Sequence, residues 1–150
     1  MPTLHPMTDP FPLHALVYVS HAAGVLDNAY LDSIQVDATT LNRVAGITGV
    51  LLFDGQRFLQ YMEGSEAALG AAFLRVQRSR RHCGIRVLMQ GEVAHRCFRK
   101  WSMACRHADA SILQRIERAR WDVRVLPHLD ADGAGNDGLA LLQAFWSSES

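Results

Sequence analysis

The chain has 150 residues, of which 49% are hydrophobic, and its 15 lysine and arginine residues balance its 15 aspartate and glutamate residues. This length and composition suit one compact domain with a sizeable core. The balanced charge argues against a nucleic-acid or charged-polymer partner, and no apolar run approaches the roughly 20 residues that cross a bilayer.

The first residues and the cysteines bear on the compartment. Residues 1–12 are rich in proline and lack the basic and apolar regions of a signal peptide, so we expect a flexible leader. Cys83, Cys97 and Cys105 follow no disulfide-framework spacing. They predict reduced thiols and a cytoplasmic protein.

The first predicted strand and helix follow the leader. Residues 13–20 form an apolar, β-branched run typical of a buried strand. Residues 27–45 follow the helical period, with Asp27 or Asn28 as a cap and Gly46 as the stop. The apolar stripe of this helix comprises Leu31, Ile34, Ala38, Leu41 and Ala45.

A hairpin and a second helix come next. Residues 47–64 contain two strand-like runs on either side of Asp54-Gly55, a dipeptide that favours a tight turn. Residues 65–80 predict a helix with Ser65 as its cap and Glu66 in its first turn. Its apolar face comprises Leu69, Ala72, Phe73 and Val76.

The rest of the chain predicts two more strands and two short helices. The strands are expected at residues 85–92 and 98–106, and the helices at 112–121 and 138–146. A flexible, glycine-rich loop is expected at residues 130–138.

The order of these elements predicts an α+β fold. It is β-α-β-β-α-β plus one strand, the pattern of a ferredoxin-like sheet with two helices on one face. In the first strand Leu16 and Tyr18 face one way while Val17 and Val19 face the other, so both faces need cover. The short C-terminal helices, a second subunit, or both must cover the second face, which favours a homodimer or larger homo-oligomer.

Five segments together resemble the BLUF family, the sensors of blue light using FAD. They are LVYVS at 16–20, NRVAGITGVLLFDG at 42–55, RFLQYMEG at 57–64, RSRRH at 78–82 and FRKWSM at 98–103. The resemblance covers residues 13–106, which would form the flavin-binding domain, and leaves residues 107–150 as a C-terminal helical extension. It implies a photoreceptor of the short stand-alone type that binds FAD non-covalently and is not an enzyme.

The resemblance also implies roles for particular residues. Tyr18 would give an electron and a proton to the light-excited flavin, and Gln60 would bridge Tyr18 to the flavin ring. Asn42 would hydrogen-bond the other edge of the ring. Trp101 and Met103 would lie on the strand that senses the change. An unidentified downstream signalling protein would receive the signal.

Arg75 lies where the family often places a residue near the flavin or its phosphate tail. Two positions depart from the family pattern. Leu41 precedes Asn42 where a hydrogen-bonding side chain is common, and Ser79 stands where an acidic residue is common. Both changes affect polar contacts with the ribityl chain, the phosphate or the ring edge of the cofactor, and neither affects the Tyr18–Gln60 pair.

The chemistry explains why these residue types suit a light sensor. A phenol can release an electron and a proton together if its hydroxyl has a defined partner. The Gln60 carboxamide has donors at one end and an acceptor at the other, so flipping or tautomerising it swaps the two at nearly constant volume. Trp101 and Met103, at a spacing of two, are expected to share a strand face, and either could enter or leave the pocket.

Other classes of function compete with this interpretation. The main alternative is a light-indifferent small-ligand-binding module on a ferredoxin-like fold, and another is a small hydrolase or flavin enzyme. His95-x-Cys97 and Cys105-x-His107 lack the spacing of known zinc sites, so no metal site is expected. The glycines at 133–138 lack the strand and lysine of a phosphate loop.

Overall fold

The computed structural model describes residues 12–23, 36, 39–80, 82–121 and 137–148. Its strands are β1 (Leu13–Ala22), β2 (Thr48–Phe53), β3 (Arg57–Gly64), β4 (His82–Val93) and β5 (Ala104–His107). Its helices are α2 (Glu66–Arg78), α3 (Ala110–Arg118) and α4 (Asp137–Ser148), and residues 39–45 are helical as well. No helix in the described ranges is long and apolar enough to span a membrane.

The five strands form one sheet in the order β4-β1-β3-β2-β5. The first four strands pair antiparallel, and β5 pairs parallel to β2 at the edge. The predicted α+β, ferredoxin-like fold is therefore confirmed. The turn between β2 and β3 lies where it was predicted, because the Asp54 carboxylate accepts from the Gln56 and Arg57 amides and Gly55 takes a positive φ of 105°.

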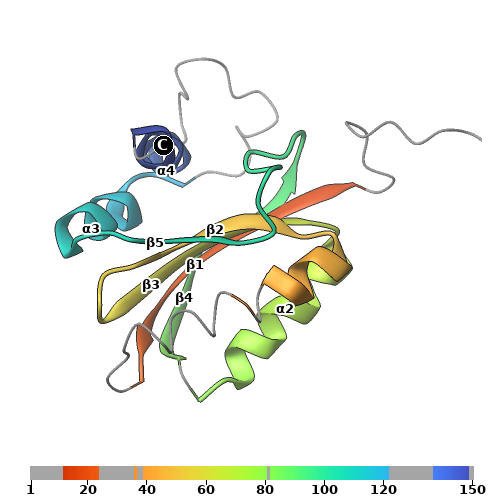
Figure 1. Cartoon of the computed structure of the whole chain (residues 1–150), viewed down its shortest axis with the longest axis horizontal. Helices are drawn as coiled ribbons and strands as arrows, with labels where there is room; N and C mark the ends of the chain where they lie inside the picture. The colour runs from red at the N-terminus through yellow and green to blue at the C-terminus, as the bar shows by residue number, and fades with distance from the viewer. Residues whose placement is uncertain (1–11, 24–35, 37–38, 81, 122–136, 149–150) are drawn as a thin grey trace, which may run out of the picture.

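Helices cover both faces of the sheet (Figure 1). On one face α2 packs on a core that includes Leu16, Tyr18 and Met62. On the other face α3 and α4 pack on a core that includes Val17, Tyr61 and Leu113. The C-terminal helices thus bury the second apolar face, which was one of the alternatives predicted from the sequence.

Helix α2 forms where its sequence predicts. Ser65 is the N-cap, its hydroxyl accepts from the Ala68 amide at 3.1 Å, and Glu66 lies in the first turn. The predicted face is also confirmed, because Leu69 and Ala72 belong to the core beneath it and the partly buried Phe73 and Val76 pack against that core. Local capping and periodicity therefore suffice to place this helix.

The helix predicted over 27–45 is only partly described. Its caps Asp27 and Asn28, and Leu31, Ile34 and Ala38, lie outside the described residues. Gly46 ends the helical turn with a φ of 74°, as predicted. The predicted apolar stripe is wrong where the helix can be seen, since Leu41 and Ala45 are exposed and Asn42 is buried.

The segment predicted as a strand over 98–106 needs a larger correction. Only Ala104–His107 is strand, and residues 98–103 are irregular. Backbone groups before β5 are held by side chains and by Gly49 at the start of β2 instead of a strand ladder, as described below. The strand predicted at 85–92 is longer than expected, and α4 begins at Asp137, inside the predicted loop.

Gly49 makes the close approach of β2 to β3 possible. A Cβ there would lie 2.0 Å from the Tyr61 carbonyl oxygen, whereas a Cβ at Gly70 in α2 would meet nothing within 4 Å. We expect Gly49→Ala to lower the free energy of unfolding by about 3 kcal/mol in urea titrations, because backbone must shift. The matched control Gly70→Ala should raise it by about 0.5–1 kcal/mol, and equal effects of the two variants would contradict this account.

Candidate functional site

Tyr18 and Gln60 form a buried pair at the centre of the sheet. They are direct cross-strand partners on β1 and β3, and the Tyr18 hydroxyl donates to Gln60 Oε1. Tyr18 is 1% exposed and Gln60 is 7% exposed. Burial raises the pKa of the Tyr18 phenol well above its ordinary value, so the hydroxyl stays protonated and acts as a donor. The structure thus brings together the two residues that the sequence placed at the centre of the chemistry.

Met103 joins this pair on the other side of the carboxamide. Gln60 Nε2 lies 3.3 Å from Met103 Sδ, and Met103 is buried in the core under α2. A thioether is a weak acceptor and an amide nitrogen carries two hydrogens. Within the described part of the chain this sulfur is the one acceptor that Nε2 meets. Gln60 therefore retains donor capacity for a ligand.

Asn42 ties the helical turn at residues 39–45 to the segment that precedes β5. Its Nδ2 donates to the Ser102 carbonyl oxygen at 3.0 Å, and the Thr39 hydroxyl donates to the Met103 carbonyl oxygen at 3.4 Å. Asn42 is 3% exposed, so its amide oxygen is also in a sheltered position. The side chain predicted to bind the cofactor thus also contacts the segment predicted to sense it.

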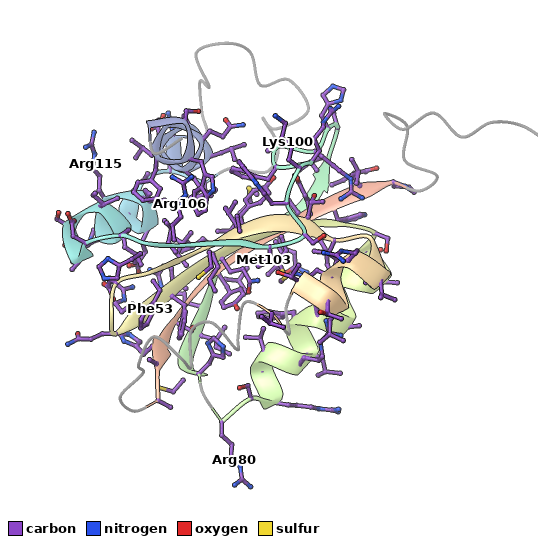
Figure 2. All side chains as sticks on the ribbon, in the orientation of Figure 1. Phe53, Arg80, Lys100, Met103, Arg106 and Arg115 are labelled. Atoms are coloured by element: carbon purple, nitrogen blue, oxygen red, sulfur yellow. The ribbon has the colours of Figure 1, made fainter. Side chains whose placement is uncertain are left out.

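Trp101 lies on the opposite side of the sheet from Met103, so the prediction that the two share a strand face is wrong. Its ring is 6.3 Å from the Phe98 ring and 6.4 Å from the Trp146 ring of α4, and it is 37% exposed. Figure 2 shows Met103 near the middle of the molecule, close to the sheet. The alternation rule fails here because residues 98–103 are not extended.

Arg75 is exposed near the end of α2. Among the described residues it makes no hydrogen bond or ion pair, and it does not contact the buried pair. Ala72 lies one helical turn before Arg75 and Ala68 two turns before it, and both pack against the core under α2. The structure therefore leaves Arg75 accessible at the edge of the site.

The sequence prediction missed three residues that surround Tyr18. The Phe73 ring lies 5.6 Å from the Tyr18 ring and the His82 ring 6.4 Å from it. The Ser20 hydroxyl is 2.8 Å from His82 Nδ1. Strand alternation predicts that Ser20, which follows Tyr18 by two, shares its face, but it gives Ser20 no role at the site. His82 carried no such signal, because β4 begins before the predicted strand.

The cysteines and histidines do not form a metal centre within the described ranges, where no three ligating side chains come together. None of the three cysteines, all of which lie in the described ranges, forms a disulfide. Burial raises the pKa of the Cys97 thiol to about 11, which disfavours the thiolate needed for nucleophilic attack.

The residues under α2 have the chemistry to hold a flavin. The isoalloxazine ring presents hydrogen-bond acceptors and donors on its edge, and Gln60 and Asn42 offer both kinds of group from buried positions. Tyr18 adds a phenol next to Gln60 on the same side of the sheet. This donor set fits the group that the resemblance implies.

The ferredoxin-like sheet and its buried tyrosine–glutamine pair define a small α+β sensor domain. The chain belongs to the BLUF family, described as sensors of blue-light using FAD, which matches residues 13–104. Among curated relatives, the photoactivated adenylate cyclase subunit alpha of Euglena gracilis is 30% identical over 86 residues, which are 57% of this chain and 8% of that protein. The chain thus spans a small part of this much longer relative.

Two solved structures extend the comparison. BlrB, a BLUF protein in its dark state, superposes with a TM-score of 0.65 at 26% identity, covering 93% of this chain and 98% of that one. A calcium and cyclic-diGMP complex of Klebsiella pneumoniae BlrP1 gives a TM-score of 0.61 at 33% identity, covering 71% of this chain and 28% of that one. The similarity to BlrB spans nearly the full length of both chains.

Proposed function

We propose that this chain is a blue-light photoreceptor that binds FAD non-covalently and signals through protein–protein contacts without catalytic turnover. The observation that carries the proposal is the buried series Tyr18–Gln60–Met103, in which a phenol, a carboxamide and a thioether are hydrogen-bonded in line. If these positions served only to pack the core, apolar side chains would be expected, because buried polar groups are costly unless they are paired.

Bound FAD supplies absorption of blue light and an acceptor for one electron. Tyr18 holds its proton against Gln60 Oε1, so its phenol can release an electron and that proton together. The dry environment that raises the pKa of Tyr18 keeps the phenol protonated in the dark.

Gln60 converts this event into a change of partners. Rotating its carboxamide puts the amide oxygen where the Nε2 donor stood, and Met103 Sδ then loses the hydrogen bond that it accepts; tautomerising it leaves the nitrogen in place as an imine NH and turns the carbonyl oxygen into a hydroxyl donor. Met103 and the residues before it are thereby biased toward a second arrangement. A local donor–acceptor exchange that biases a two-state element is a general form of molecular switch.

The remaining roles follow from position. Asn42 would hold the second edge of the flavin ring, and the guanidinium of Arg75 would suit its phosphate tail. Residues 13–106 would form the flavin-binding domain, residues 107–150 a signalling extension, and residues 1–12 a leader. The receiver would be an unidentified signalling protein or another copy of the chain in a homo-oligomer, and reduced cysteines favour the cytoplasm.

An absorption spectrum before and after illumination tests the proposal. Purified protein supplied with FAD should turn yellow, and its flavin bands should move to the red in blue light and return in darkness. Protein that stays colourless would favour the light-indifferent ligand-binding module. Steady turnover of a substrate would favour a flavin enzyme.

A further inference from the structure

Glu63 is a carboxylate that the photochemistry leaves without a role. It lies on β3 three residues after Gln60, so the two side chains point to opposite faces of the sheet. Glu63 is 0% exposed. Burial raises the pKa of its carboxyl, while the hydrogen bonds it accepts and nearby Arg96 oppose that rise. A fully buried carboxylate is expensive, so its contacts call for an explanation.

The carboxylate holds the backbone of Cys97 and Phe98, which lie between β4 and β5. Glu63 Oε1 accepts from the Cys97 amide at 2.7 Å, and Oε2 accepts from the Phe98 amide at 2.7 Å and from the Thr48 hydroxyl at 3.0 Å. Arg96 reinforces the arrangement by donating to Thr48 Oγ1 at 2.8 Å. Hydrogen bonds from backbone amides to a carboxylate are among the stronger ones in proteins.

The far end of the same segment rests on the sensor residues. Residues 97–103, here called the switch segment, start at the Glu63 carboxylate and end at Met103, which contacts Gln60. In between, the Trp101 carbonyl oxygen accepts from the Gly49 amide at 3.0 Å. Side chains on both faces of β3 therefore hydrogen-bond to the switch segment: Glu63 bonds its first two residues, and Gln60 bonds Met103 at its end.

This double attachment determines where a displacement must go. If Met103 moves while Cys97 and Phe98 stay fixed, the change falls on the residues between them, including Trp101. Trp101 lies against Trp146 of α4, and the Arg106 guanidinium lies 5.3 Å from the centre of the Trp146 ring. Figure 2 shows Arg106 on the side of α3 and α4. Without the hydrogen bonds to Glu63, residues 97 and 98 could move as well, and the displacement of Met103 would not be passed to Trp101 and α4.

We propose that Glu63 is a positioning residue for the light response: it anchors the start of the switch segment so that a change at Gln60 is delivered to Trp101 and α4. The inference rests on the proposed photoreceptor function, but it concerns the face of the sheet opposite the flavin site. It assigns the output surface to α4 and makes the response at α4 separable from the response of the flavin.

The test is Glu63→Gln in full-length protein loaded with FAD, followed by hydrogen–deuterium exchange in darkness and under blue light. Glutamine offers one acceptor oxygen, so either the Cys97 or the Phe98 amide faces an NH₂ group. We expect dark exchange at these amides to rise about tenfold. The light-induced change in exchange of α4 should fall to roughly a third of the wild-type change or less, while the flavin red shift keeps its wild-type amplitude.

Two further variants keep the test decisive. Glu92→Gln changes an exposed glutamate of β4 and should leave both responses unchanged. If Glu63→Gln does not fold, Thr48→Val carries the test, because it removes the hydrogen bond to Oε2 and the one that Thr48 accepts from Arg96 but leaves both amide bonds to Glu63. It should lower the α4 response in the same direction by a smaller factor.

Three results would overturn the inference. The first is an α4 helix in wild-type protein whose exchange does not change on illumination although the flavin red shift occurs. The second is an α4 response of Glu63→Gln equal to that of the wild type despite faster exchange at Cys97 and Phe98. The third is loss of the red shift in Glu63→Gln. A wild-type protein that binds FAD without any red shift would instead overturn the proposed function, so the two failures are distinguishable.

Discussion

Replacing Tyr18 with phenylalanine should leave FAD bound and abolish the reversible red shift. The substitution removes only the hydroxyl that donates to Gln60 Oε1, and the ring that packs against Phe73 remains. Without that hydroxyl no proton is held against the carboxamide, and the phenyl ring is a much poorer electron donor than a phenol. The measurement is the difference spectrum between illuminated and dark protein, and we expect no reversible difference above noise.

Tyr61→Phe is the matched control for this variant. Tyr61 is also fully buried, on the next strand over, but its ring lies on the α3–α4 side of the sheet and its hydroxyl faces Cys97 Sγ at 3.7 Å. It should keep the red shift. A Tyr18→Phe protein that cycles like the wild type would rule out the role given to Tyr18, whatever the control does.

Replacing Gln60 with leucine should remove the shift by a different route. Leucine has similar size but neither accepts from Tyr18 nor donates to Met103. The Tyr18 hydroxyl then stays buried without a partner, at a cost of about 1–3 kcal/mol that urea titration of the variant should detect. The spectrum should show bound flavin with no reversible red shift, and light should no longer alter hydrogen exchange in α4.

The control for Gln60→Leu is Gln90→Leu, which changes an exposed glutamine of β4 that pairs with Leu16 of β1. It should retain both the shift and the exchange response. Normal photocycling of Gln60→Leu would show that the switch lies elsewhere. Together the Tyr18 and Gln60 variants separate the source of the proton from the group whose partners change.

The regular elements could be predicted from the sequence because short-range rules govern them, and the central pair because of the family resemblance. The family resemblance implied that Gln60 contacts Tyr18, and the antiparallel register of β1 and β3 makes them partners in the structure. Ser65 followed by an apolar period defines α2, and Asp54-Gly55 defines the hairpin. The signals for α2 and for the hairpin each act over a few residues.

The switch segment could not be predicted, because its structure depends on contacts between residues far apart in the sequence. Glu63 and Phe98 are 35 residues apart, and Asn42 and Ser102 are 60 apart. The same contacts turn Asn42 inward while Leu41 is exposed, against the apolar stripe. The pattern of apolar and polar residues does not predict which distant backbone group a buried polar side chain will hydrogen-bond.

By itself, then, the sequence determined the ferredoxin-like sheet, the family and, through the resemblance, the pairing of Tyr18 with Gln60. Only the tertiary structure decided that Met103 contacts Gln60, that Trp101 lies against α4 on the opposite side, and that Glu63 anchors the segment between them. The physical reason is that periodicity fixes the direction of side chains only where the backbone is regular. In irregular segments long-range hydrogen bonds set that direction.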